Sequence, residues 1–250
     1  MHALLEEVFA RGTVTLEGTV TNVHSSISLC RGEFLQQLMR ELQPRITLEI
    51  GLAFGISAMF ICDALREVSD HRHIVIDPNQ FGGAWGDTWN GVGMKLLRTA
   101  GFGDRVELHQ APSYAALPPL EQHITVDVAF VDGWHTFDYC LVDFLLLDRL
   151  LRPGGVIVLN DAHWPSIRKV CRYILTNRDY VVLKCLHTIH DKTDWITSRA
   201  MPPVPERVRR ELRPEVREPD EELGLATRAE CVALMKRDGD RRRWDFHEEF

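Results

Sequence analysis

The stretch LEIGLAFGIS, residues 48–57, places two glycines, a carboxylate and a serine directly after a short apolar run. A glycine turn from a strand into a helix lets the backbone approach a ligand closely, and the free N–H groups of the helix N-terminus attract a carboxylate or phosphate. A dinucleotide fingerprint requires GxGxxG, whereas Ala53 stands where its second glycine would be. The turn therefore predicts a nucleotide-like ligand without the dinucleotide pattern. A strand-to-helix connection with no ligand is the competing interpretation.

Strand-like and helix-like apolar patterns alternate on both sides of this turn, which is typical of a parallel sheet covered by helices. The predicted strands lie at 46–50, 73–77, 105–111, 126–132 and 152–161, and the predicted helices at 32–42, 56–68, 92–100, 136–151 and 166–175. Two further strand patterns, at 179–187 and 230–238, enclose a stretch rich in Pro, Arg and Glu. They predict an antiparallel pair at one edge of the sheet.

The predicted architecture is a doubly wound α/β domain, residues 44–250, with a mostly parallel seven-stranded sheet and a polar insertion near 195–228. We expect the part of the insertion at 200–225 to be mobile or to cover the mouth of the active site. Residues 1–43 are predicted to be a helical segment that contributes to the active-site wall.

Composition limits the classes of partner. A net charge of −7 argues against a nucleic-acid backbone as the main partner, and no apolar run approaches the length of a membrane span. The N-terminus lacks the basic-then-apolar order of a secretory signal, so we expect a cytoplasmic protein. The six cysteines form no CxxC pair and are expected to be buried thiols. A small molecule is the expected partner, and self-association is left open.

Asp77, at the end of the second predicted strand, adds a second constraint. A carboxylate there can accept hydrogen bonds from both ribose hydroxyls of an adenosine-type ligand. An Asp before Pro is also a common turn former. Together with the glycine turn, Asp77 predicts an adenosine that carries something other than a pyrophosphate.

On these residues, the chain resembles the class I S-adenosylmethionine-dependent methyltransferases over residues 24–240. LEIGLAFGIS is similar to the family's first motif, which holds the methionine part of the cofactor, and VIDPNQ (75–80) is similar to the second. The resemblance assigns adenine contacts to the loop after the third strand. The aromatic ring of Trp134 is expected to stack on adenine or acceptor, or simply to roof the cleft. The implied cofactor contacts are Glu49, Gly51, Ala53, Gly55, Ser57, Asp77, Gln110, Ala111, Ser113, Asp132 and Trp134.

The stretch VDVAFVDGWHTFDYCLVDFLLLDRLLRPGGVIVLNDAHW, residues 126–164, is similar to the catalytic region of O-methyltransferases, both the metal-dependent catechol type and the bacterial type acting on sugars and macrolides. By that resemblance Asp132 and Asp161 match the aspartates that hold Mg²⁺, and His135 falls at the position of the base. Ala162 stands where the family has an Asn ligand, so Asn160 or His163 would have to replace it.

The resemblance implies methyl transfer to a hydroxyl of a natural product or sugar. His135, expected to be neutral at cytosolic pH, would take the hydroxyl proton, and a hard cation on Asp132 and Asp161 would favour the alkoxide. Three alternatives stay open: a metal-independent O-methyltransferase, an N-methyltransferase, and a non-catalytic protein that binds S-adenosylmethionine. In the competing, purely structural interpretation, His135 caps the following helix or hydrogen-bonds to the backbone. Asp132 and Asp161 are then strand-end acids that interact with loop N–H groups.

Overall fold

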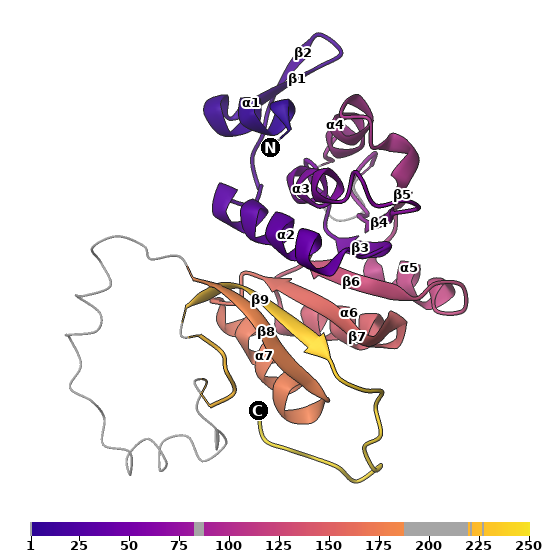
Figure 1. Cartoon of the computed structure of the whole chain (residues 1–250), viewed down its shortest axis with the longest axis vertical. Coiled ribbons are helices and arrows are strands. Elements are labelled where there is room, and N and C mark those ends of the chain that lie inside the picture. The colour runs from indigo at the N-terminus through magenta and orange to yellow at the C-terminus, as the bar shows by residue number, and fades with distance from the viewer. Residues whose placement is uncertain (1, 83–87, 188–219, 221, 227) are drawn as a thin grey trace, which may run out of the picture.

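A seven-stranded sheet crosses the middle of the computed structural model, which describes residues 2–82, 88–187, 220, 222–226 and 228–250 (Figure 1). The strand order is β5-β4-β3-β6-β7-β9-β8. The strands are β3 Ile46–Ile50, β4 Arg72–Ile76, β5 Val106–His109, β6 Val126–Val131, β7 Leu151–Asn160, β8 Tyr180–His187 and β9 Ala229–Lys236. The first five are parallel, which confirms the predicted doubly wound sheet.

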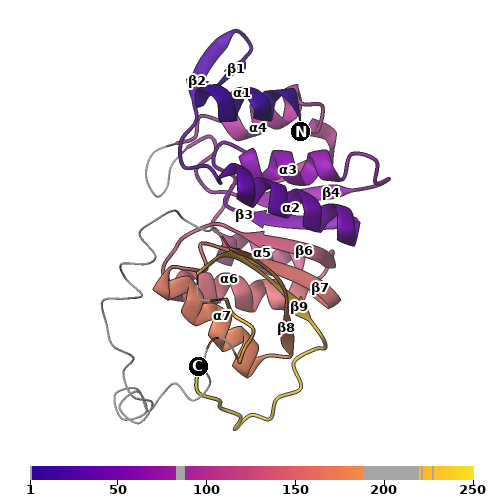
Figure 2. The same ribbon diagram turned by 60° about the vertical axis from the view of Figure 1, so that its left-hand side comes forward.

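Helices cover both faces of this sheet (Figure 2). One layer holds α2 Leu29–Leu42, α3 Ile56–Ala64 and α4 Val92–Thr99, and the other holds α5 Ser113–Leu120, α6 Phe137–Leu150 and α7 Pro165–Asn177. Alternate residues of one strand enter different cores: Val128 and Phe130 pack with the first layer, Ala129 and Val131 with the second. Burial on both faces explains why the central strands are continuous apolar runs in the sequence.

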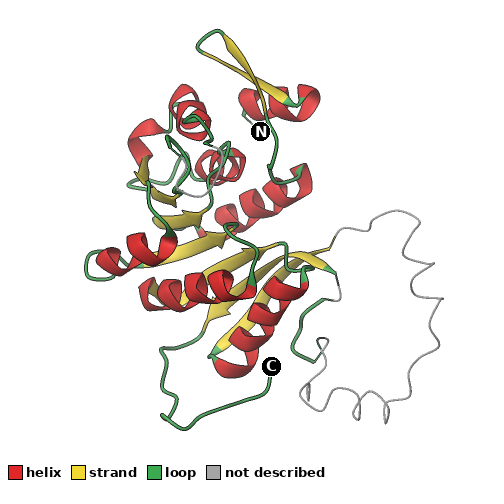
Figure 3. Ribbon diagram, turned by 180° about the vertical axis from the view of Figure 1, so that it is seen from behind, coloured by secondary structure: helices red, strands yellow, loops and turns green. Residues whose placement is uncertain are grey.

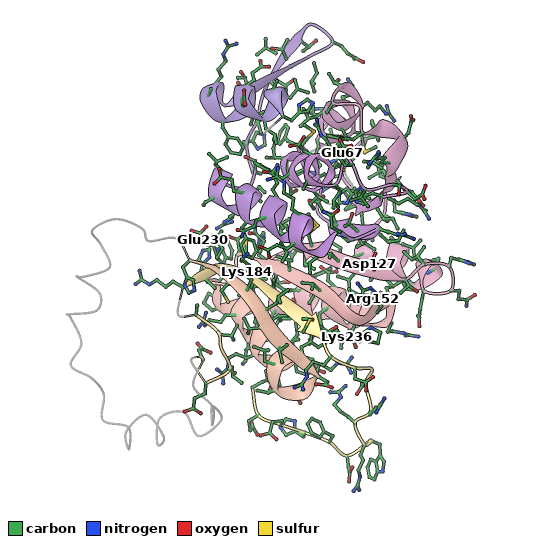
Figure 4. All side chains as sticks on the ribbon, viewed as in Figure 1. Glu67, Asp127, Arg152, Lys184, Glu230 and Lys236 are labelled. Atoms are coloured by element: carbon green, nitrogen blue, oxygen red, sulfur yellow. The ribbon has the colours of Figure 1, made fainter. Side chains whose placement is uncertain are left out.

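The last strand, β9, runs antiparallel between β7 and β8, which confirms the predicted terminal pair. Asp127 lies on β6, at the end of the strands opposite the glycine turn, and links β6 to the two neighbouring strands β3 and β7 (Figure 4). Its carboxylate accepts the backbone N–H groups of Arg45 and Ile46, each at 2.9 Å, and pairs with Arg152 at 2.6 Å. Most of the predicted insertion, including the part at 200–219, lies outside the described residues.

The N-terminal segment contains a feature that the sequence analysis did not predict. Helix α1 Ala3–Arg11 leads into an antiparallel hairpin of β1 Thr13–Leu16 and β2 Thr19–Asn22, at the end of the molecule away from β8 (Figure 3). Glu17 and Gly18, with φ of 50° and 78°, form its two-residue turn, as in type I′ hairpins. Val14 and Leu16 are buried in the core on this face of the sheet, where β1 contacts α1 and α4.

Helix α5 was also not predicted, because Pro118 and Pro119 lie within it and proline is a poor helix former. Within the described part of the chain, no helix is long and apolar enough to cross a membrane.

Candidate functional site

A cavity of about 700 Å³ opens at the carboxyl ends of β3, β4, β6 and β7. Its wall includes the turn after β3, Asp77 after β4, Asp132 after β6 and Asp161 after β7. This is the edge at which doubly wound sheets bind ligands, because the strand order reverses there. The structure therefore brings the predicted ligand turn and the predicted catalytic aspartates into one space.

The glycine turn is fixed by close backbone packing. Gly51 has a φ of 94°, and a Cβ added to it would lie 2.2 Å from the carbonyl oxygen of Asp132. Gly55 has a φ of 79°, and a Cβ there would lie 3.0 Å from the carbonyl oxygen of Gly93 on α4. Both positions need glycine, for backbone conformation and for space. The turn leaves bare backbone of Gly51 at the cavity wall.

Asp77 connects this turn to β4. Its Oδ2 accepts the N–H groups of Leu52 and Ala53 at 3.1 and 2.8 Å, and its Oδ1 accepts the N–H of Asn79 at 2.8 Å. Only 3% of the residue is exposed, yet it borders the cavity. These contacts hold the carboxylate in place at the wall, and its ribose role stays a prediction.

The structure places Glu49 behind the wall rather than on it. Its fully buried carboxylate accepts a hydrogen bond from the Ser57 hydroxyl and pairs with His73 Nε2 at 2.9 Å. Burial raises the pKa of Glu49. Ser57 itself lies on the cavity wall. This geometry gives Glu49 a positioning contact with Ser57 in place of the predicted direct contact with cofactor.

Asp132, His135 and Asp161 meet at the other end of the cavity. His135 Nε2 lies 2.9 Å from Asp161 Oδ2 and 3.5 Å from Asp132 Oδ1. Asp161 has a φ of 53°, a left-handed conformation that costs energy for a residue with a Cβ. A strained residue at a strand end is a common feature of functional sites.

The two carboxylates control the charge of His135. Hydrogen bonds to Asp132 and to Asp161 raise the pKa of His135 to about 9. For Asp161, burial opposes ionisation, but the hydrogen bond from His135 and the charge of Arg31 lower the pKa overall. In the metal-free site the imidazole is therefore protonated at neutral pH. For the metal-free site, the expectation of a neutral His135 was wrong, because it ignored the two adjacent negative charges.

Arg31, on α2, completes this ion-pair network and was not predicted. Its Nη1 lies 2.9 Å from Asp161 Oδ1, and its Nε lies 2.8 Å from Glu230 Oε2. Glu230 lies at the start of β9 (Figure 4). Arg31 also lines the cavity. Nothing in the sequence signals a contact between residues so far apart in the chain.

Asp132, His135 and Asp161 also form a candidate metal site. Their ligand atoms all lie within 4.8 Å of one another, and they are the one such group of three or more His, Cys, Asp or Glu among the described residues. Asn160 Nδ2 donates to Asp132 Oδ1 at 2.8 Å and to Asp161 Oδ2 at 3.1 Å. The carboxylates of Asp132 and Asp161 fit a hard divalent cation such as Mg²⁺ or Mn²⁺, whereas ligation by the His135 imidazole would favour a transition metal. Exposed His163 lies outside this group, so its predicted ligand role is not supported.

The remaining predicted residues are divided between the wall and its surroundings. Ser113 and Trp134 line the cavity, whereas Gln110 and Ala111 do not. The exposed ring of Trp134 lies 6.3 Å from that of Tyr139. The structure therefore brings only Ser113, of the three predicted adenine contacts, to the cavity.

Two further ring side chains near the site differ in position. His24 packs edge-on against Phe54 at a centroid distance of 4.7 Å and does not line the cavity. Trp164, at 47% exposed, stands beside His135 with ring centroids 5.0 Å apart.

A second residue missed by the sequence analysis is Asp143 on α6. Its carboxylate lines the cavity, is 2% exposed and accepts a hydrogen bond from the Ser113 hydroxyl. Asp143 falls inside the apolar run LVDFLLL (141–147), and a lone acid at a buried helical position was its only signal.

Comparison with known proteins agrees with this arrangement. Residues 48–162 match a family model described as a methyltransferase domain. This segment of the chain is therefore similar to a methyltransferase domain. The matched segment begins with the glycine turn and ends just after Asp161, so residues from both ends of the cavity fall within it.

Relatives in sequence and in structure support the same class. The chain is similar to caffeoyl-CoA O-methyltransferase 2 of Zea mays, with 29% identity over 161 residues, covering 60% of this chain and 57% of that protein. It is similar to catechol O-methyltransferase of Bos taurus, with 26% identity, covering 63% of this chain and 54% of that protein. The chain thus spans somewhat over half the length of these relatives.

A solved structure extends the likeness to the fold. An O-methyltransferase of Streptomyces achromogenes, TomG, in complex with S-adenosylmethionine, superposes with a TM-score of 0.58 and 22% identity, covering 86% of this chain and 82% of that one. At this level of identity, the likeness concerns the fold alone.

Proposed function

We propose that the protein transfers the methyl group of S-adenosylmethionine to a hydroxyl of a small molecule. The observation that carries this proposal is the shared cavity, which the glycine turn and Asp77 line together with Asp132, His135 and Asp161. A cofactor bound along the turn and an acceptor beside His135 would occupy one space. The O-methyltransferase relatives support the choice of oxygen as the methyl acceptor.

The residues present fit the cofactor. A cavity of about 700 Å³ is of the size that holds a ligand of this class. Gly51 exposes backbone where a Cβ would not fit, Asp77 offers carboxylate oxygens for ribose, and the first turn of α3 directs N–H groups to this end of the sheet. When bound, S-adenosylmethionine supplies a methyl group already activated on a sulfonium.

His135 would act as the proton acceptor, with Asp132 and Asp161 orienting its ring. A neutral imidazole is required for this role, whereas the metal-free pKa of about 9 keeps the proton on His135 at neutral pH. A divalent cation held by Asp132 and Asp161 would favour the ionised acceptor and replace the positive charge of His135. Arg31 would hold the far oxygen of Asp161 in place.

A metal-independent reaction is the second candidate, and the charges of the site favour it. Arg31 and protonated His135 already pair with both oxygens of Asp161. These two cationic side chains thus face Asp132, Asp161 and Glu230 even when no metal ion is bound. In this variant His135 would lose its proton to solvent at high pH before accepting that of the substrate.

The acceptor we propose is a small natural product or sugar hydroxyl, used by a cytoplasmic protein that binds neither nucleic acid nor membrane. A catechol belongs in the first set of test compounds, because a catechol O-methyltransferase is among the relatives. Self-association of the chain stays a separate question for sedimentation measurements.

Methyl transfer from radiolabelled S-adenosylmethionine to a panel of catechols, hydroxylated natural products and sugars tests the proposal, with EDTA in one series and Mg²⁺ in the other. Labelled O-methyl product is the expected result. Loss of product with EDTA selects the metal-assisted reaction, and equal rates select the metal-independent one. Tight cofactor binding without transfer to any compound would favour a non-catalytic protein, and transfer to amines alone would overturn the choice of oxygen.

A further inference from the structure

Asp143 is a buried carboxylate that the proposed methyl transfer does not use. It lies on the cavity wall but belongs to α6, at a distance along the chain from both the glycine turn and the aspartate cluster. Its hydrogen bond from Ser113 joins α6 to the start of α5, two helices that pack against each other.

The carboxylate has too few donors for its burial. A carboxylate offers about four acceptor positions, and buried polar groups are normally paired. Among the described residues, the Ser113 hydroxyl is the one hydrogen-bond donor to Asp143, although only 2% of the residue is exposed. A Cβ added to Gly133 would lie 3.7 Å from Asp143 Oδ2, so the second oxygen faces another residue of the cavity wall. The carboxylate of Asp143 can therefore accept a further hydrogen bond from a donor group on a bound ligand.

The order of the strands indicates which part of the cofactor would meet it. Along the sheet edge, Asp161 follows β7, Asp132 follows β6, Gly51 follows β3, Asp77 follows β4 and Ser113 comes after β5. In the proposed function, the methyl group reacts beside β6 and β7, and Asp77 accepts hydrogen bonds from the ribose. Ser113 lies beyond Asp77 in this order, on the side of the ribose away from the reaction.

We propose that Asp143, positioned by Ser113, accepts a hydrogen bond from the exocyclic amino group of the cofactor's adenine and so selects an adenosine over a deaminated nucleoside. This inference rests on the proposed function, since it requires S-adenosylmethionine in the cavity. It adds a base-selecting residue that lies on a helix instead of a strand-end loop. Ser113 then acts as a positioning residue that holds one oxygen of Asp143.

The ionisation of Asp143 is consistent with this role. Burial raises its pKa to about 6, against the opposing hydrogen bond from Ser113. At pH 7.5 the carboxyl group is therefore mainly ionised and can only accept hydrogen bonds. An amino group is the matching donor.

Calorimetric titration with two ligands that differ at one position tests the proposal. S-adenosylhomocysteine carries the 6-amino group, and S-inosylhomocysteine carries an oxo group there. We expect the wild-type protein to bind the adenosyl ligand about 30-fold more tightly, because the oxo group would face a carboxylate. Asp143→Asn should reduce this ratio to about 3-fold or less, since its amide can donate to the oxo group.

The ratio separates recognition from damage to the fold, because both ligands share every other group. Asp138→Asn is the matched control, since Asp138 is an exposed acid on the same helix and outside the cavity wall. It should leave both affinities unchanged. A wild-type ratio near one, or an unchanged ratio in Asp143→Asn, would overturn the assignment of Asp143. Failure of the wild-type protein to bind either ligand would instead overturn the proposed function.

A third ligand tests whether Asp143 binds the other hydrogen-bond donor of the cofactor, its ammonium group, instead of the adenine. The methionine ammonium could also approach a carboxylate, and 5′-methylthioadenosine lacks it while keeping the adenine. We expect Asp143→Asn to weaken methylthioadenosine by the same factor as S-adenosylhomocysteine. An effect confined to S-adenosylhomocysteine would show that Asp143 binds the ammonium and would contradict the proposal.

Discussion

The glycine turn after β3 and the cluster of Asp132, His135 and Asp161 border the same cavity but are stabilised differently. At the turn, backbone atoms pack so closely that a Cβ on Gly51 would meet a carbonyl oxygen at 2.2 Å. In the cluster, side chains from separate strand ends are held by opposite charges. Steric constraints fix the conformation of the turn, whereas the charges of the cluster depend on the protonation of His135.

The largest effect should come from filling the turn. In Gly51→Ala the methyl group would overlap the backbone of Asp132, and alanine is disfavoured at a φ of 94°. We expect the free energy of unfolding to fall by at least about 3 kcal/mol, together with loss of S-adenosylhomocysteine binding. Urea denaturation and calorimetry measure the two effects.

Gly239→Ala is the control for this substitution, since a Cβ at Gly239 meets no atom within 4 Å. Its stability should change by no more than about 0.5 kcal/mol. Normal cofactor affinity in Gly51→Ala would show that the close approach to Asp132 is not required.

Removal of His135 should act on turnover and spare binding. We expect His135→Ala to reduce the transfer rate about 100-fold, because no other described imidazole lies among the cavity-lining residues. The affinity for S-adenosylhomocysteine should change by less than about 3-fold. His163→Ala, which removes an exposed imidazole outside the cavity, is the matched control and should be fully active. Unchanged turnover in His135→Ala would remove His135 from the reaction.

Protons and cations should compete at the cluster. Because His135 is protonated below a pKa of about 9, cation binding at Asp132 and Asp161 must displace that proton or its charge. We expect the affinity for Mn²⁺ to rise about tenfold between pH 7 and pH 8, and electron paramagnetic resonance can follow free Mn²⁺. An affinity that does not depend on pH would contradict this competition, as would equal pH dependence in His135→Ala.

The smallest expected effect concerns stability in EDTA. The folded-state pKa of His135, about 9, lies above its ordinary value of 6.5. Its ion pairs therefore contribute fully below pH 6.5, and the contribution is lost as the pH rises through 9. Denaturation curves between pH 6 and 9.5 should show a decline that His135→Gln reduces. An identical decline in the variant would assign it to other groups.

The same difference between the glycine turn and the charged cluster explains which features could be predicted from the sequence. Central strands are apolar on both faces, so the run at 46–50 was predicted at its observed bounds. The turn was predictable because its two glycines lie only four positions apart in the sequence. Asp132 and Asp161 were predictable because parallel strands end at one edge of the sheet. The hairpin formed by β1 and β2 was missed because its strands are short and partly exposed.

Side chains on helices were not predictable in the same way. Arg31 and Asp143 reach the cavity from α2 and α6, and their role depends on how each helix is rotated against the sheet. The charge of His135 depended in turn on Asp161, which lies 26 positions away in sequence. Sequence patterns located the strand ends, but the electrostatics between them required the structure.

The central claim is that the glycine turn and Asp77 bind an adenosine carrying no pyrophosphate. Calorimetric titration of the wild-type protein with S-adenosylhomocysteine and, separately, with NAD⁺ tests it most directly. The claim predicts saturable binding of one S-adenosylhomocysteine per chain and no measurable binding of NAD⁺. Binding of NAD⁺ in place of S-adenosylhomocysteine, or binding of neither, would contradict it.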